Sequence, residues 1–208
     1  NRCISDGEPS HGDDVSVPAR EGRIGQPLSP YGAGKRMGEL LASTYQRCFD
    51  LETVCLRYFN VVGPRQDPSG AYAAVIPRWC SQLLRGEQPE IYGDGETTRD
   101  FCPVEDVVQA NLLAARAPLD SCGGVFNVAL GRATTLKELF RMIRDTLVGL
   151  GVPCESVEPR LGPFRPGDVR HSRADIRRAS ELLGFRPNSD LRPCLKRTIA
   201  ALLREGNP

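Results

Sequence analysis

The chain has few histidines and no closely spaced cysteines, and these scarcities exclude several classes of protein. Its only histidines are His11 and His171, and no two of its 8 cysteines form a Cys-x-x-Cys pair. Zinc sites need close ligand pairs, so the sequence predicts no metal site. No apolar run approaches the roughly 18 residues of a membrane span. With a net charge of +1, neither a membrane nor a nucleic acid is the expected partner.

The composition is that of an ordinary globular protein. The 208 residues, 40% hydrophobic and 25% charged, suffice for one large domain or two small ones. Several cysteines lie within apolar segments, where a free thiol behaves as a small hydrophobe, so we expect a reducing, cytoplasmic setting. Residues 1–6 contain no apolar signal core. The missing initiator methionine suggests a start inside a longer reading frame.

Hydrophobic periodicity predicts an α/β fold. A helical pattern runs from about Ser29 to Phe49, with Ser29 as a candidate N-cap. Its apolar stripe contains Met37, Leu40, Leu41 and Tyr45. The β-favouring run 53–62 follows directly and is typical of a strand buried on both faces of a parallel sheet. Ligands bind beyond the carboxyl ends of such strands, so the loop 63–70 is a candidate site.

Further elements are expected downstream. Residues 90–95 predict a short strand and turn, with 99–102 returning beside it, and 125–129 predict a buried strand. Helices are expected over 73–85, 104–117, 135–150, 173–183 and 191–204. In the second of these, Val107, Val108, Leu112 and Ala115 form the expected apolar side. Thr134 or Thr135 is expected to cap the third, with Glu138 nearby.

A tyrosine and a lysine four residues apart open the first helix. Tyr31 and Lys35 lie within SPYGAGK, residues 29–35. Residues at i and i+4 share one helical face, so the phenol and the ammonium can project into a single site. A nearby ammonium favours the ionised phenolate, which suits Tyr31 to acid–base chemistry. Taken alone, the spacing also fits a solvated pair on an exposed helix.

Five stretches in this order resemble the extended short-chain dehydrogenase/reductase family, the NAD-dependent sugar-nucleotide epimerases and dehydratases. The likeness is greatest to UDP-N-acetylglucosamine 4-epimerases and runs from about residue 10 to the C-terminus. The stretches are SPYGAGK (29–35), LRYFNVVGPRQDPSGAYAAVIPRW (56–79), GDGETTRDF (93–101), VFNVA (125–129) and FRPGDVRHS (164–172).

The resemblance implies an α/β fold: the C-terminal part of a Rossmann-like parallel sheet plus a small α/β substrate-binding domain. The N-terminal dinucleotide-binding half would be missing. Residues 1–72 would be the remnant of the Rossmann domain, with the tyrosine helix and one core strand. Residues 73–208 would form mostly the substrate-binding domain, with 103–129 returning to the Rossmann sheet.

The resemblance also implies a reaction, C4 epimerisation of a UDP-hexose of the UDP-GlcNAc/UDP-GalNAc type. In the family, the tyrosine phenolate removes the 4-hydroxyl proton while C4 gives hydride to NAD. The 4-keto sugar turns over and receives the hydride on its other face. Tyr31 and Lys35 would be the catalytic pair and would also contact NAD, with Tyr58 beside the nicotinamide.

The same resemblance assigns substrate contacts. Asn60 would bind the sugar or its phosphate, and Ser172 would contact the sugar. Uridine would pack against Ala74, Val75 and Trp79. Arg99 and Arg165 would bind the diphosphate, because a planar guanidinium suits that group, and Asp168 would accept from the uridine ribose. Other interpretations stay open: Trp79 as simple core, Asp168 paired with Arg165 or Arg170, and Asn60 capping a turn.

The chain departs from the family at its start. Family members begin with a strand and a GxxGxxG turn that holds the pyrophosphate, and no such segment precedes Tyr31. Gly32, Gly34 and Gly38 overlap the tyrosine helix instead. The family's catalytic Ser/Thr would fall at residues 7–9, which contain no hydroxyl. We therefore expect the isolated chain to bind NAD weakly or not at all, to be inactive, and to aggregate unless a partner covers its sheet edge.

Two alternatives to the epimerase remain. One is a nucleotide-sugar dehydratase or decarboxylase, and the other is a non-catalytic nucleotide-sugar-binding remnant. A homodimer through the Tyr31 helix, which is common in the family, is a further expectation.

Overall fold

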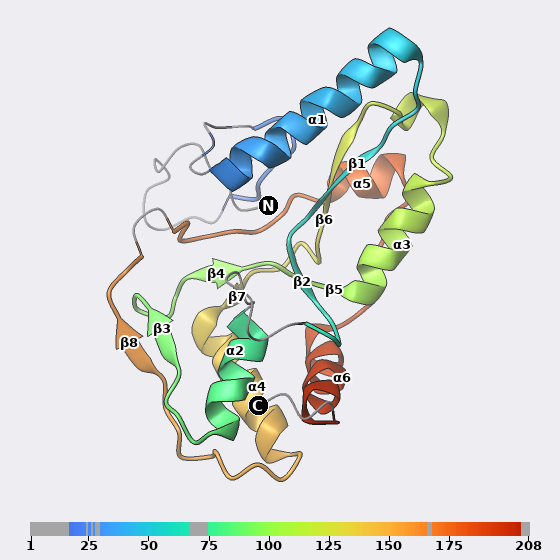
Figure 1. The fold of residues 1–208 in the computed structure, drawn as a ribbon. Coiled ribbons are helices and arrows are strands. Elements are labelled where there is room, and N and C mark those ends of the chain that lie inside the picture. The colour runs from blue at the N-terminus through green and yellow to red at the C-terminus, as the bar shows by residue number, and fades with distance from the viewer. Residues whose placement is uncertain are drawn as a thin grey trace. The chain divides into compact units, whose positions relative to one another are not determined.

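The structure, a computed structural model, describes residues 17–23, 25, 27, 30–66, 75–165 and 168–204. Ser29 and Ala74, a predicted cap and a predicted uridine contact, lie outside these residues. The described residues fall into two compact units (Figure 1). The first unit draws on 1–61, 99–133 and 171–188, and the second on 62–98, 134–170 and 189–208.

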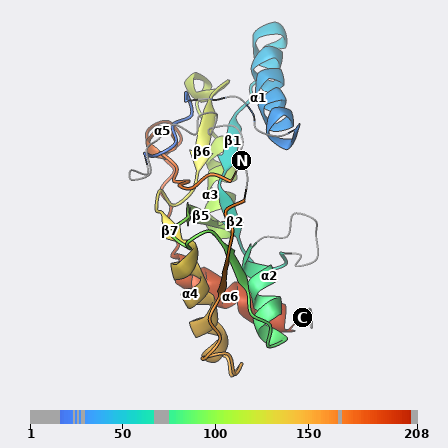
Figure 2. The same cartoon turned by 90° about the vertical axis from the view of Figure 1, so that its left-hand side faces the viewer.

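The sheet of the first unit is parallel. Helix α1 (Pro30–Phe49) is followed by β1 (Cys55–Tyr58), which runs parallel to β6 (Val125–Val128) with Cys55 opposite Val125. The two strands lie side by side in both views (Figures 1 and 2). This arrangement, a helix followed by a parallel strand, confirms the predicted α/β class.

The predicted single strand over 53–62 is two strands. The chain leaves the ladder at Phe59 and continues as β2 (Asn60–Val62), which pairs with β5 (Phe101–Pro103). The expected burial on both faces is wrong, because only Arg57 and Val62 are buried in these two strands. Among the described strands, β1 has a neighbour on one side only, so its apolar side chains stay half exposed.

The core of the first unit lies between the strands and two helices, α3 (Val104–Ala114) and α5 (Arg177–Leu182). Its fully packed members are Cys102, Ala110, Phe126, Val128, Ala179, Leu183 and Phe185. The predicted apolar side of α3 is wrong in part, since Val108 and Leu112 are 53% and 59% exposed. Ala110 faces the core instead, and its small side chain lets α3 approach the strands closely. A short 3-10 turn, η1 (Leu119–Ser121), leads to β6.

The second unit is built on three helices, α2 (Val75–Leu84), α4 (Leu136–Val148) and α6 (Leu191–Arg204), which pack on one another (Figure 1). Trp79 of α2 meets Phe140 of α4 edge to face, with ring centroids 6.0 Å apart. The predicted cap of α4 is confirmed. The Thr135 hydroxyl accepts the backbone N–H of Glu138, and the Glu138 carboxylate accepts that of Thr135.

The strands of the second unit pair differently from the prediction. β3 (Glu90–Tyr92) runs parallel to β8 (Arg160–Gly162), and β4 (Thr98–Arg99) pairs with β7 (Thr134–Thr135). The predicted return of 99–102 beside 90–95 is therefore wrong. Positive φ angles at Gly93 and Gly95 turn the chain after β3, and the neighbour of β3 comes from a segment 70 residues later.

Candidate functional site

The phenol of Tyr31 and the ammonium of Lys35 lie together on α1. Lys35 Nζ is 5.2 Å from the centroid of the Tyr31 ring. Both side chains are exposed, Tyr31 by 52%. Their proximity follows from local geometry, because one turn of helix separates residues at i and i+4. The Tyr31 hydroxyl can exchange a proton with a hydroxyl of a ligand, and the Lys35 ammonium beside it can stabilise the resulting negative charge.

A buried ion pair attaches this helix to the sheet. Glu39 follows Lys35 by one turn and is 9% exposed, and Arg57 of β1 is 5% exposed. The guanidinium donates through Nε to one Glu39 oxygen and through Nη2 to the other at 2.8 Å. Burial alone would raise the pKa of Glu39, but the hydrogen bonds and charge of Arg57 outweigh it and hold that pKa below its ordinary value.

The same network reaches β6 and the segment before α1. Arg57 Nη1 donates to the backbone carbonyl of Glu21 at 3.1 Å, and the Glu21 carboxylate accepts the backbone N–H of Asn127 at 2.9 Å. Sequence analysis did not identify Glu39 or Arg57. The available signal was a charged residue inside the otherwise apolar run 53–62, because such a residue must find a partner once it is buried.

Three predicted substrate residues of the first unit gather around Asp100. Asn60 donates to the Asp100 carbonyl oxygen through both its backbone N–H and its side-chain amide, each at 3.1 Å. Arg99 precedes Asp100 and is 2% exposed, while Ser172 is 9% exposed. Asp100, which sequence analysis did not single out, accepts a hydrogen bond from Ala174, two residues after Ser172.

Tyr58 is not brought together with Tyr31. Its hydroxyl donates to Asn111 Oδ1 of α3 at 3.0 Å. Successive strand residues point to opposite faces, so Tyr58 lies on the face opposite Arg57, whose side chain contacts α1. The nicotinamide contact predicted for Tyr58 remains a prediction.

The remaining predicted residues belong to the second unit. The Arg165 guanidinium stacks over the Tyr92 ring, 3.8 Å from its centroid, and its carbonyl accepts the backbone N–H of Asp168 at 3.1 Å. Val75 begins α2, and Trp79 is 1% exposed. Trp79 thus packs in the core, and the uridine contact predicted for it remains a prediction. These placements bring the 93–101 and 164–172 stretches together, as the bond from Arg170 to Asp94 at 2.6 Å shows.

Residues 7–129 match the NAD dependent epimerase/dehydratase family. The chain belongs to this family. The match covers more than half of the sequence and includes the Tyr31–Lys35 pair, Asn60 and Arg99. The resemblance predicted from five sequence stretches is thus confirmed at the level of the family, and the family's NAD dependence agrees with the predicted cofactor.

Known proteins of the family are similar over nearly the whole chain. A putative UDP-glucose 4-epimerase of Methanocaldococcus jannaschii is 37% identical over 195 residues, 94% of this chain and 60% of the relative. The crystal structure of a UDP-glucose 4-epimerase from Thermotoga maritima with UDP-glucose matches with a TM-score of 0.85 and 37% identity, over 99% of this chain and 62% of that one.

A second solved structure carries an N-acetylated sugar. The UDP-N-acetylglucosamine 4-epimerase of Methanobrevibacter ruminantium, in complex with UDP-N-acetylmuramic acid, matches with a TM-score of 0.85 and 38% identity. That match covers 97% of this chain and 60% of the relative. The chain therefore spans about three-fifths of the length of the epimerases that it matches.

Two kinds of feature are absent from the described residues, a metal site and a membrane-spanning helix. Within them, no group of three or more histidine, cysteine or carboxylate side chains is placed to hold a metal ion. No helix in that part of the chain combines the length and apolar character that crossing a bilayer requires.

Proposed function

We propose that this chain is the substrate-side part of an NAD-dependent enzyme that inverts C4 of a UDP-hexose, of the UDP-GlcNAc/UDP-GalNAc type. The observation that carries the proposal is the exposed Tyr31–Lys35 pair on α1, 5.2 Å apart, in a chain that belongs to the epimerase family. The proposed domain division assigns residues 1–72 to the Rossmann remnant and 73–208 mostly to the substrate-binding domain, with 103–129 returning to the Rossmann sheet.

The chemistry of the two side chains fits this reaction. Bound NAD would supply the hydride chemistry at C4 of the sugar. Tyr31 accepts the proton of the 4-hydroxyl and returns it to the same oxygen when the 4-keto group is reduced to an alcohol. The Lys35 ammonium stabilises the phenolate and supplies donors for the ribose hydroxyls next to the nicotinamide. Both residues are exposed, so neither must be uncovered to meet cofactor or sugar.

The proposed substrate contacts are assigned within each unit separately. In the first unit, Asn60 and Ser172 contact the sugar in this proposal, and Arg99 binds the diphosphate. Tyr58 lies beside the nicotinamide. In the second, Arg165 serves the diphosphate, Asp168 the uridine ribose, and Val75 and Trp79 the uridine, together with Ala74 outside the described residues. The stacking of Arg165 on Tyr92 supports its part, because it holds the guanidinium plane in one orientation.

The 208-residue chain alone is proposed to be inactive and to bind NAD weakly. It spans about three-fifths of the relatives' length, and in the described residues β1 pairs only with β6. A parallel sheet is normally covered and paired on both sides of a central strand.

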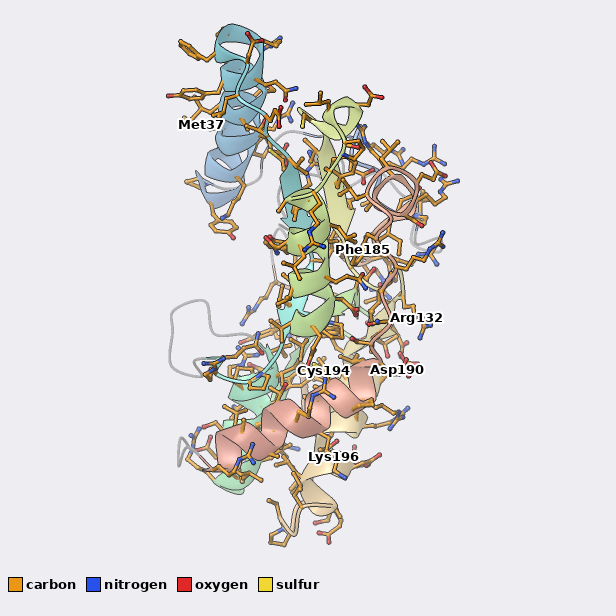
Figure 3. All side chains as sticks on the ribbon, turned by 90° about the vertical axis from the view of Figure 1, so that its right-hand side faces the viewer. Met37, Arg132, Phe185, Asp190, Cys194 and Lys196 are labelled. Atoms are coloured by element: carbon orange, nitrogen blue, oxygen red, sulfur yellow. The ribbon has the colours of Figure 1, made fainter. Side chains whose placement is uncertain are left out.

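A homodimer through α1 is also proposed. Met37, Leu41 and Tyr45 are 61%, 55% and 50% exposed on this helix, and Met37 points away from β1 and β6 (Figure 3). Apolar side chains in a row on one helix face are typical of an interface rather than of a solvated surface.

The test compares the 208-residue chain with a longer version that restores an upstream NAD-binding half. Both are incubated with UDP-GlcNAc and NAD, and UDP-GalNAc is measured. Turnover is expected only in the longer version. In it, Tyr31→Phe and Lys35→Met should abolish activity. Tyr45→Phe, which changes an equally exposed tyrosine of the same helix, should not.

The outcomes separate the alternatives. A 4-keto-6-deoxy or decarboxylated product would identify a dehydratase or decarboxylase instead of an epimerase. Binding of UDP-GlcNAc without turnover in the longer version would favour a non-catalytic nucleotide-sugar-binding protein. Micromolar, stoichiometric NAD binding by the 208-residue chain would refute its proposed weak binding.

A further inference from the structure

We propose that Asp100 is a positioning residue of the substrate site, a buried clamp that holds Asn60, Arg99 and Ser172 in their places. The inference rests on the proposed function, because these three are its substrate residues in the first unit. Asp100 itself is 0% exposed, and its carbonyl and carboxylate oxygens accept hydrogen bonds from the protein's own groups.

The carboxylate of Asp100 joins two segments that lie far from it in the sequence. Oδ1 accepts the backbone N–H of Leu130 at 3.1 Å, from the loop after β6. Oδ2 accepts the backbone N–H of Ala174 at 3.0 Å. Because these donors come from separate segments, the two oxygens of one side chain fix the distance between them.

The main chain of Asp100 adds a third segment. Its carbonyl oxygen accepts both the backbone N–H and the side-chain amide of Asn60, at the start of β2. Each proposed substrate residue of the first unit is held at, or lies within two residues of, one of these bonds. Asn60 is itself held, Arg99 is the preceding residue, and Ser172 lies two residues before Ala174. A shift at Asp100 would therefore move all three together.

Only a carboxylate satisfies both side-chain contacts. An asparagine would present one oxygen and one NH₂ group, so either Leu130 or Ala174 would face a donor instead of an acceptor. A protonated Asp100 likewise presents an O–H donor where one of the two backbone N–H groups needs an acceptor. Burial raises the pKa of Asp100 to about 6, against the opposing effect of backbone N–H groups from Ala174, Leu130, Arg132 and Gly131.

Other ionisable groups lie on the segments that pack against Asp100. They are Arg99, Arg132, His171, Arg173 and Asp175. His171 is the one imidazole among these groups. A His171→Gln background therefore isolates the contribution of Asp100.

The experiment measures UDP-GlcNAc affinity calorimetrically between pH 5 and 8 for the full 208-residue chain. UDP-GlcNAc is a suitable probe because its diphosphate is esterified at both ends and does not titrate in this range. The matched control is Asp106→Asn, since Asp106 is also 0% exposed and accepts one backbone N–H, from Asn188 at 3.0 Å. It belongs to α3 and touches none of the substrate residues.

Asp100→Asn should weaken UDP-GlcNAc binding about tenfold at pH 8, the cost of one unsatisfied buried donor. Asp106→Asn should leave the affinity unchanged. In the His171→Gln chain the affinity should fall as the pH drops through about 6, and Asp100→Asn should remove this inflection. Amide hydrogen exchange at Leu130 and Ala174 should accelerate in Asp100→Asn, which checks the clamp in a chain that remains folded.

The inference and the proposed function fail in different ways. Equal affinities of wild type and Asp100→Asn, equal losses in the two asparagine variants, or a flat pH profile would overturn the positioning role alone. If the wild type binds no UDP-GlcNAc at any pH, the proposed substrate contacts of Asn60, Arg99 and Ser172 fall, and this inference falls with them.

Discussion

Gly93 lies directly against the ring of Phe164. A Cβ atom placed on Gly93 would be 2.3 Å from Phe164 Cε1, and the φ angle of Gly93 is +84°. The positive φ angle favours glycine there, and an added Cβ would displace the Phe164 ring, which is 57% exposed. The contact joins the turn after β3 to the segment that carries Arg165, which stacks on the neighbouring Tyr92.

Gly93→Ala should therefore destabilise the second unit by roughly 2–4 kcal/mol, backbone strain plus overpacking. Gly86→Ala is the matched control, since its φ is +69° but nothing lies within 4 Å of its added Cβ. The free energy of unfolding of that variant should fall only by the cost of backbone strain, about 1–2 kcal/mol. Urea unfolding of both variants measures the difference, and equal losses would show that the Phe164 contact contributes nothing.

The Arg57–Glu39 ion pair is expected to hold α1 in place. Arg57→Met, which keeps the apolar stem, should cost about 2–3 kcal/mol because it leaves Glu39 buried without its main partner. This is at the low end for such a pair, since Arg36 also donates to Glu39 at 3.0 Å. Arg85→Met, which breaks the exposed pair with Glu87 and the hydrogen bond to Ser81, should cost far less, because an exposed ion pair contributes little.

The same variant predicts a pH dependence. The pKa of Glu39 is below its ordinary value of 4.5 in the folded chain, so its stabilising contribution is present above that value. The contribution is lost as the pH falls through the folded-state pKa. The stability difference between wild type and Arg57→Met should therefore shrink on acidification below about pH 4.5. A difference that stays constant down to pH 3 would contradict the assignment.

The apolar face of α1 predicts self-association. Leu41→Lys places a charge among Met37 and Tyr45 and should convert an associated chain into a monomer, as measured by sedimentation equilibrium. Leu182→Lys on α5, at a position 46% exposed against 55% for Leu41, should leave the mass unchanged. A monomeric wild type, or a Leu41→Lys chain that associates as before, would remove α1 as the interface.

The cap of α4 should contribute measurably to the free energy of unfolding. Thr135→Ala removes the acceptor for the Glu138 backbone N–H and should cost about 1 kcal/mol. Thr135→Ser keeps the hydroxyl and should recover nearly all of it. Thermal unfolding distinguishes the two, and an equal loss in both would mean that the methyl group, not the cap, matters.

Features that depend on neighbours along the chain were predictable from the sequence. The start of α4 at Thr135 and the approach of Lys35 to Tyr31 need only the geometry of one helical turn. The parallel class of the sheet followed from the order of helix and apolar strand. The family followed from short motifs whose order survives without any three-dimensional information.

Features that depend on distant segments were decided by the tertiary structure. Strand β3 pairs with β8, 70 residues later, and Asp100 bonds to Leu130 and Ala174, 30 and 74 residues away. The burial of Ala110 in place of Leu112 likewise depends on which strands α3 meets. Periodicity records which residues share a face of one element, but it carries no information on which other element covers that face.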